Sequence, residues 1–177
     1  MNFVKKYCLN RQLRDFLQKR VNKNVNVHAL KGANSICFLI RGGDSNRVDE
    51  LLKIASQYKE KKMVIVCYLS SNERFNMTDT PSFLYTLSSK DVGLTGRIGD
   101  EKLKNIFLQH YDIFIDMNDK TDLISLYLQT LFNADFRIGG NKLFHKHFDF
   151  VLCADEQRSL KEYMSNLELY TSYFTST

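Results

Sequence analysis

Proline, glycine and tryptophan are scarce in this sequence, which has one proline, eight glycines and no tryptophan in 177 residues. Such a composition excludes collagen-like repeats and argues against linkers and long disordered segments. No apolar run approaches the roughly 20 residues that a membrane-spanning helix needs. No apolar stretch or cleavage site follows Met1 to Tyr7, so we expect no secretory signal. Hydrophobic residues make up 44% of the chain, enough for the core of one domain.

Cysteine is present but without the spacing of a metal or redox motif. Cys8, Cys37, Cys67 and Cys153 are far apart, and no CxxC pair occurs. Three of them lie in apolar, strand-like runs, where a free cysteine behaves as a small buried hydrophobe. We therefore expect reduced thiols and a cytoplasmic protein, with a disulfide framework as the alternative.

The positive charge is concentrated at the N-terminus. The formal net charge is +5, but residues 1–31 hold eight lysines and arginines against Asp15 alone, so the other 146 residues carry about −2. Apolar residues recur at helical spacing among the basic ones, which predicts an amphipathic helix over about residues 2–20. Its basic surface would consist of Lys5, Lys6, Arg11, Arg14, Lys19 and Arg20.

The rest of the chain alternates between short apolar runs and helical patterns. Continuous apolarity is typical of strands covered on both faces, as in parallel sheets with helices on each side. The expected strands are 35–40, 63–69, 83–87, 113–117, 134–138 and 148–153, and helices are expected between most of them, including 122–132 and one beginning at Asp155. Strand and helix alternating at 20-to-30-residue intervals indicate right-handed βαβ units.

The fold class predicted from this pattern is α/β. We expect a three-layer, mostly parallel, Rossmann-like or flavodoxin-like sheet of five or six strands, with an extra N-terminal helix. Residues 1–22 would form the helix and residues 23–177 a single domain. The pattern leaves the order of the strands open.

Open α/β sheets bind ligands beyond the carboxyl ends of their strands, so we expect site residues there. Arg41-Gly42-Gly43-Asp44-Ser45 follows the first predicted strand and opens a helix. Its backbone amides could hold a phosphate near Arg41 and Asp44, although the Asp44 carboxylate would repel an anion. The turn lacks the GxGxxG spacing and a following Gly-Lys-Ser/Thr, so a tight turn with a helix cap is the alternative.

Asp116 is the strongest candidate among the acidic residues. It ends a predicted central strand, where a carboxylate could do acid–base work or hold Mg²⁺. Asp119 and Asp122 follow it, but they lie where helix capping already favours acidic residues.

His145, His147 and Asp149 form a weak candidate for a metal site. Side chains at i, i+2 and i+4 share one face if the segment is extended, and these residue types bind Zn²⁺. The alternative is a solvated turn that leads into the last strand. We expect no metal and no cofactor.

Five stretches together resemble an uncharacterised family of short α/β proteins found mainly in Bacteroidetes, which usually open with a Lys-rich helix. The stretches that carry the resemblance are 26–31, 35–39, 89–91, 111–116 and 134–139. This resemblance implies an α/β fold in a bacterial, cytoplasmic setting and brings no established activity.

Residues 111–139 also look like part of the N-terminal half of heptosyltransferase-type glycosyltransferases. The shared features are a YDxxID strand, an apolar helix and an Arg-Ile-Gly sequence. In that family a second domain holds most of the nucleotide-sugar, and this chain has no room for one. The resemblance implies at most that Asp116, Arg137 and Gly139 line the edge of a similar cleft.

These observations favour a non-catalytic cytoplasmic domain that binds a protein or an anionic surface, RNA or membrane, through its basic helix. A helix that packs on the domain and leaves its charges in water is the structural alternative. The functional alternative is a small enzyme, or the remnant of a glycosyltransferase-like domain, acting on an anionic or sugar-like ligand near Asp116 and Arg41.

Overall fold

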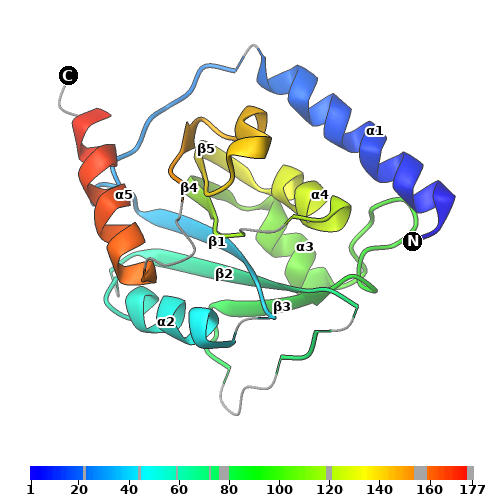
Figure 1. Ribbon diagram of the computed structural model, residues 1–177, viewed down its shortest axis with the longest axis horizontal. Helices are drawn as coiled ribbons and strands as arrows, with labels where there is room; N and C mark the ends of the chain where they lie inside the picture. The colour runs from blue at the N-terminus through cyan, green and yellow to red at the C-terminus, as the bar shows by residue number, and fades with distance from the viewer. Residues whose placement is uncertain are drawn as a thin grey trace.

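The computed structural model describes residues 1–21, 23–43, 45–58, 60–71, 73–75, 80–118, 121–153 and 159–174. Helices and strands alternate along most of this chain (Figure 1). Their order is α1 (Phe3–Arg20), β1 (Ser35–Arg41), α2 (Ser45–Ala55), β2 (Lys62–Leu69), β3 (Leu84–Ser88), α3 (Glu101–Leu108), β4 (His110–Asp116), α4 (Leu123–Leu131), β5 (Asn133–Gly139), the 3₁₀-helix η1 (Lys142–His147), β6 (Phe150–Val151) and α5 (Leu160–Phe174).

The six strands form one sheet in the order β3-β2-β1-β4-β5-β6, and each neighbouring pair is parallel. This confirms the predicted α/β class and supplies the strand order that the sequence left open. The chain adds strands outward from β1 on one side and then returns to continue from β4 on the other. The order therefore reverses between β1 and β4, as in Rossmann-like sheets.

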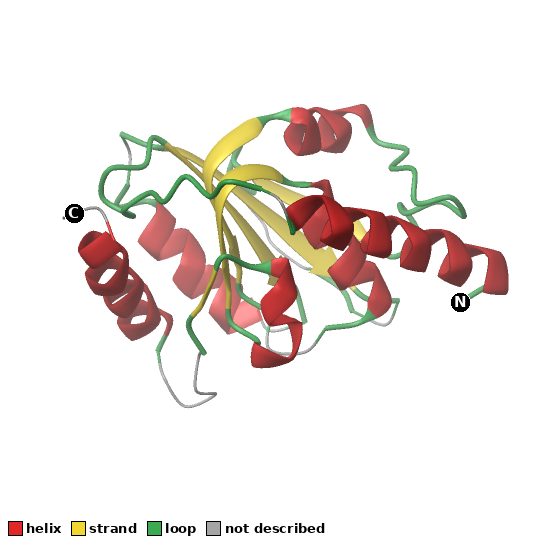
Figure 2. Cartoon of the chain, turned by 90° about the horizontal axis from the view of Figure 1, so that it is seen from above, coloured by secondary structure: helices red, strands yellow, loops and turns green. Residues whose placement is uncertain are grey.

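Helices cover both faces of the sheet (Figure 2). One core contains side chains of α2 and α5, and the other contains side chains of α1, α3 and α4. The strand residues between them are almost fully buried, with five consecutive buried positions in β1 and six in β2. Burial on both faces explains why these strands are continuous apolar runs in the sequence.

The N-terminal helix packs on the domain. Leu9 and Leu13 are its buried residues, and α1 lies along α4. Asn2 caps its first turn, where the Asn2 side chain accepts a hydrogen bond from the Val4 amide. Among the described residues, no helix has the length and apolarity required to cross a membrane.

Two predicted strands differ in extent from the observed ones. β4 begins at His110, three residues before the apolar run, because polar residues at the edge of the sheet still join the ladder. The last strand is much shorter than the predicted 148–153 and contains only Phe150 and Val151. Phe148 instead turns its ring into the core over Gly139. All four cysteines are free.

Candidate functional site

The carboxyl edge of the sheet brings together several of the predicted site residues. Arg41 ends β1, Asp116 ends β4 and Gly139 ends β5. Leu39 is paired with Asp116, and Asp116 with Gly139, so these strand ends are neighbours in the ladder. These predicted residues therefore lie at one common edge of the sheet, near the point where the strand order reverses.

At the β1–α2 turn, a carboxylate of the protein lies where a phosphate would be expected. Arg41 Nε donates to Glu73 Oε1 at 2.7 Å, and the Ser70 amide donates to Glu73 Oε2 at 2.8 Å. A Cβ atom at Gly43 would lie only 2.6 Å from Glu73 Oε1. Partial burial alone would raise the pKa of Glu73, but these hydrogen bonds together lower it. Glu73 is thus the charge partner of the turn, and Asp44 lies outside the described residues.

Asp116 is 1% exposed and belongs to a chain of buried hydrogen bonds. Its Oδ1 accepts from the backbone amide and the side chain of Asn118, and its Oδ2 accepts from Gln129 Nε2 on α4. Burial raises the pKa of Asp116 to about 7, although these hydrogen bonds act in the opposite direction. A carboxyl group with such a pKa could exchange a proton near neutrality. Its side chain, however, is enclosed by the protein.

Arg137 is also 1% exposed, and it ties three backbone segments together. Its guanidinium donates to the carbonyl oxygens of Gln129, Phe132 and His147. The Phe16 and Phe114 rings approach it as cation–π partners, with centroids 5.0 and 4.5 Å from Cζ. These contacts connect α1, α4 and β4 to β5, and they use donors that would otherwise recognise an anion.

Gly139 gives Phe148 room to pack against the sheet. A Cβ atom at Gly139 would lie 2.3 to 2.5 Å from atoms of the Phe148 ring. The glycine at this strand end therefore serves close packing of an aromatic side chain.

The histidines of the predicted metal cluster are not on a strand. Residues 142–147 form η1, so the alternation expected of an extended segment does not apply. His145 is exposed, whereas His147 is buried with Nδ1 3.0 Å from Gln129 Oε1. Asp149 pairs with Arg20 of α1 and accepts a hydrogen bond from the Arg137 amide. Burial, with the nearby positive charges of Arg137 and Arg20, lowers the pKa of His147 to about 4.

The six predicted basic residues of α1 divide into two groups. Two are used inside the molecule: Lys5 Nζ donates to the carbonyl oxygens of Ser89 and Val92, and Arg20 pairs with Asp149. The other four face outward and form no ion pair with any residue in the described part of the chain; they are Lys6, Arg11, Arg14 and Lys19.

Three apolar side chains share this outer surface of α1. Phe3 is 82% exposed, Tyr7 57% and Val4 51%. Phe3, Tyr7 and Arg14 lie close to one line along the helix, because residues three or four apart are neighbours on a helix surface. We call Phe3, Val4, Lys6, Tyr7, Arg11, Arg14 and Lys19 the outer face of α1.

A pocket of about 320 Å³ opens beside the start of α1. It lies at the ends of β2 and β3 and at the N-terminus of α4, with Lys5, Ser70, Ser71 and Ser89 among its lining residues. On its wall, Tyr68 donates its hydroxyl hydrogen to Asp122 Oδ2 at 3.0 Å. Asp122 also caps α4, so Tyr68 and Asp122 are both already hydrogen-bonded.

The opposite edge of the sheet holds a polar cluster that the sequence reasoning missed. His28, His110, Asp112 and Asp135 meet at the amino-terminal ends of β4 and β5. None of these four residues is among the site candidates predicted from the sequence. A signal was nonetheless available, because Asp112 and Asp135 interrupt two apolar strands at equivalent positions.

Comparison with known proteins gives a family without an activity. No curated protein and no solved structure matches this chain. The similarity of residues 111–139 to heptosyltransferase-type glycosyltransferases therefore stays a prediction. Residues 5–174 match a family described as a family of unknown function (DUF6913), and the chain belongs to that family.

Proposed function

We propose that this protein is a non-catalytic cytoplasmic domain that binds an anionic membrane surface through the outer face of α1. The observation that carries the proposal is the combination of exposed aromatic and basic side chains on one helix surface. Phe3 and Tyr7 are more than half exposed, and Lys6, Arg11 and Arg14 lie exposed beside them. Helices that bind at the membrane interface combine these residue types.

Charge alone would suit RNA equally well, but the apolar side chains favour lipid. Phe3, Val4 and Tyr7 are grouped at one end of α1, so together they offer an apolar tip. A bilayer would bury that tip among acyl chains while lysines and arginines meet lipid phosphates. The phosphate groups of a nucleic acid offer no apolar environment in which the Val4 side chain could be buried.

The other surface of α1 is already used for docking on the domain. Leu9 and Leu13 are buried, and Phe16 lies against Arg137. Membrane binding therefore requires no unfolding of the helix from the sheet. The basic outer face is presented by a helix that the domain holds in place.

For the residues at the carboxyl edge we propose a positioning role. Arg41, Asp116, Arg137 and Gly139 each have partners within the protein, as described above. Because these residues are occupied by contacts within the protein, they support the hypothesis of a binding domain over that of a small enzyme.

The proposal is tested by sedimentation with lipid vesicles. The full chain is mixed with vesicles of phosphatidylcholine alone or of phosphatidylcholine with phosphatidylglycerol. We expect binding only to the anionic vesicles, and weaker binding as salt is added. The variant Lys6→Glu/Arg11→Glu/Arg14→Glu should lose about 100-fold in affinity or more, since each basic residue contributes about 1 kcal/mol at an anionic surface.

Two further variants separate charge from apolar contact. Lys53→Glu/Lys62→Glu/Lys102→Glu makes the same change of charge at exposed lysines outside α1 and should retain most of the binding. Phe3→Ser/Tyr7→Ser should weaken binding while leaving the charge intact. Equal loss in both charge variants, or equal binding to neutral vesicles, would contradict the proposal. Binding to RNA without binding to vesicles would assign the helix to nucleic acid instead.

A further inference from the structure

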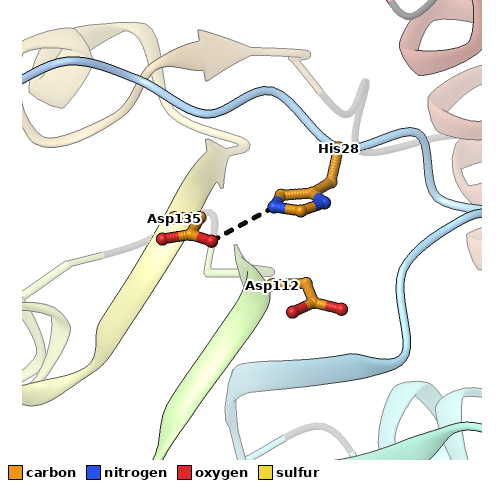
Figure 3. A group of neighbouring side chains, drawn as sticks. All are labelled: His28, Asp112 and Asp135. Carbon is orange, nitrogen blue, oxygen red and sulfur yellow. Dashed lines mark hydrogen bonds and ion pairs between the residues drawn. The ribbon is translucent and has the colours of Figure 1, made fainter.

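The polar cluster at the amino-terminal edge of the sheet is built from three separate segments. His28 comes from the connection between α1 and β1, Asp112 from β4 and Asp135 from β5. Figure 3 shows the three side chains as neighbours from separate segments, with the His28 ring directed at the Asp135 carboxylate. No contact with the outer face of α1 or with the Asp116 network is involved.

The sheet itself forces the two carboxylates together. Tyr111 is paired with Ala134 and Ile113 with Phe136, which places Asp112 beside Asp135 on adjacent strands. Like charges at laterally neighbouring positions destabilise a sheet. The structure offsets this repulsion with partners for each carboxylate, His28 and His110 for Asp135 and two backbone amides for Asp112.

The distances match those between ligands of one metal ion. His28 Nε2 lies 3.2 Å from Asp135 Oδ2, and one ligand atom from each of His28, Asp112 and Asp135 lies within 4.8 Å of the other two. Ligands at about 2.0 Å from a tetrahedral Zn²⁺ lie about 3.3 Å apart. The His28–Asp135 separation is close to this value, and Asp112 offers an oxygen within 4.8 Å of both.

His110 contacts the Asp135 carboxylate through the oxygen that His28 does not contact. Its Nε2 lies 3.2 Å from the other oxygen of the Asp135 carboxylate, Oδ1. A histidine that holds the second oxygen of a ligating carboxylate fixes its orientation, as outer-shell partners of metal sites do. His110 is therefore a positioning residue.

The three ligand-bearing segments are held in place by contacts of their own. The amides of Asn34 and Ser35 donate to Asp112 Oδ2, at 2.6 and 3.2 Å, which leaves the other oxygen of that carboxylate for an ion. Leu30, two residues after His28, is fully buried, and its amide donates to Thr171 Oγ1 on α5. The site is thus organised before any ion arrives.

We propose that His28, Asp112 and Asp135 bind a divalent transition-metal ion, with Zn²⁺ as the expected ion. One imidazole and two carboxylates form the nitrogen and oxygen set that suits zinc. The His28 and Asp135 side chains are 26% and 28% exposed, so an ion can enter from solvent. Three protein ligands leave a coordination position for water. Lys23 donates to the carbonyl oxygen of Ala134, next to Asp135. This nearby positive charge lowers the affinity of the site for a metal ion.

The proposal is tested by calorimetric titration of the full chain with Zn²⁺ near pH 7.5. We expect saturable binding of one ion and a higher melting temperature in its presence. The variants His28→Ala and Asp135→Asn should lower the affinity more than about 100-fold, and His110→Ala by about 10- to 100-fold, because it acts through Asp135. His145→Ala is the matched control, since it removes an exposed histidine outside the cluster and should leave the affinity unchanged.

A second readout uses the unaltered protein and does not depend on the folding of a variant. In NMR spectra, Zn²⁺ should shift the ring resonances of His28 and leave those of His145 in place. Absence of saturable binding would overturn the proposal. So would full affinity in His28→Ala and Asp135→Asn, or a zinc-dependent shift confined to His145.

Discussion

Asp116 and His147 are held by the two ends of one side-chain amide. Gln129 donates from Nε2 to Asp116 Oδ2, while its Oε1 lies 3.0 Å from Nδ1 of His147. This orientation requires His147 to carry its proton on Nδ1. The carboxyl group at the end of β4 and the imidazole of η1 are therefore coupled through the middle of α4.

This coupling predicts two opposite effects of pH on stability. Burial raises the pKa of Asp116 from 3.8 to about 7, so the folded protein holds a proton that the unfolded chain releases, and stability falls as pH rises through this window. The pKa of His147 is lowered from 6.5 to about 4, so stability rises with pH between these values. From about pH 4 to 6.5 the two contributions, each up to about 1.4 kcal/mol per pH unit, oppose one another.

Single variants of Asp116 and His147 should separate their two contributions to the pH dependence of stability. Relative to the wild type, Asp116→Asn should show stability that rises with pH between about 4 and 6.5, because of these two groups only His147 then contributes. His147→Gln should show stability that falls between about pH 4 and 7. Urea unfolding at a series of pH values measures both profiles. Parallel profiles in all three proteins would show that neither group titrates as described.

Replacing Arg137 should be among the most destabilising changes in the protein. Arg137→Met keeps the apolar volume but leaves three buried carbonyl oxygens without a donor and Asp149 with one fewer charged neighbour. We expect a loss of about 3–5 kcal/mol in the free energy of unfolding. Arg137→Lys should recover only part of it, since an ammonium cannot reach three separate carbonyls in the guanidinium geometry. Recovery to wild-type stability in Arg137→Lys would contradict this role.

Two glycines give a matched test of close packing. Gly139→Ala drives a Cβ atom into the Phe148 ring, and we expect a loss of about 1–3 kcal/mol or more. Gly99→Ala adds the same atom where nothing lies within 4 Å, so its effect should stay within about 0.5 kcal/mol. Thermal and urea unfolding of the two variants are compared directly; similar losses would refute the contact with Phe148.

The two surfaces of α1 should respond differently to truncation. Leu9 is fully buried, and Leu9→Ala should cost about 2–4 kcal/mol of stability. Phe3 is 82% exposed, and Phe3→Ala should change stability by less than about 0.5 kcal/mol while still weakening vesicle binding. If Leu9→Ala has no effect on unfolding, α1 does not dock on the domain as described.

The sequence predicts the sheet well because strands buried on both faces leave a strong signal. Continuous apolar runs located β1 and β2 to within a residue. Boundaries were less accurate where polar residues take part in the ladder, as at His110.

The roles of the site residues could not be read in the same way, because a residue type does not specify its partners. Arg137 and Asp116 are the residues that a ligand site would use, yet two helices of the protein supply their partners. Phe16 of α1, far from Arg137 in sequence, contacts its guanidinium, and Gln129 of α4 donates to Asp116. Glu73, which neutralises the β1–α2 turn, lies 32 residues after Arg41. The His28 cluster depends on the register of β4 and β5, which the strand pattern alone does not determine.

The ion pair of Arg20 with Asp149 and the cation–π contact of Phe16 with Arg137 also bear on the order in which the protein folds. Asp149 and Arg137 are synthesised more than a hundred residues after Arg20 and Phe16, so these two contacts form only after most of the domain has been made. Until the core residues that pack with Leu9 have been synthesised, the apolar stripe of α1 at Leu9 and Leu13 stays uncovered on the nascent chain. Contacts of such long sequence separation slow folding and extend the time in which this stripe is open to chaperones or to aggregation.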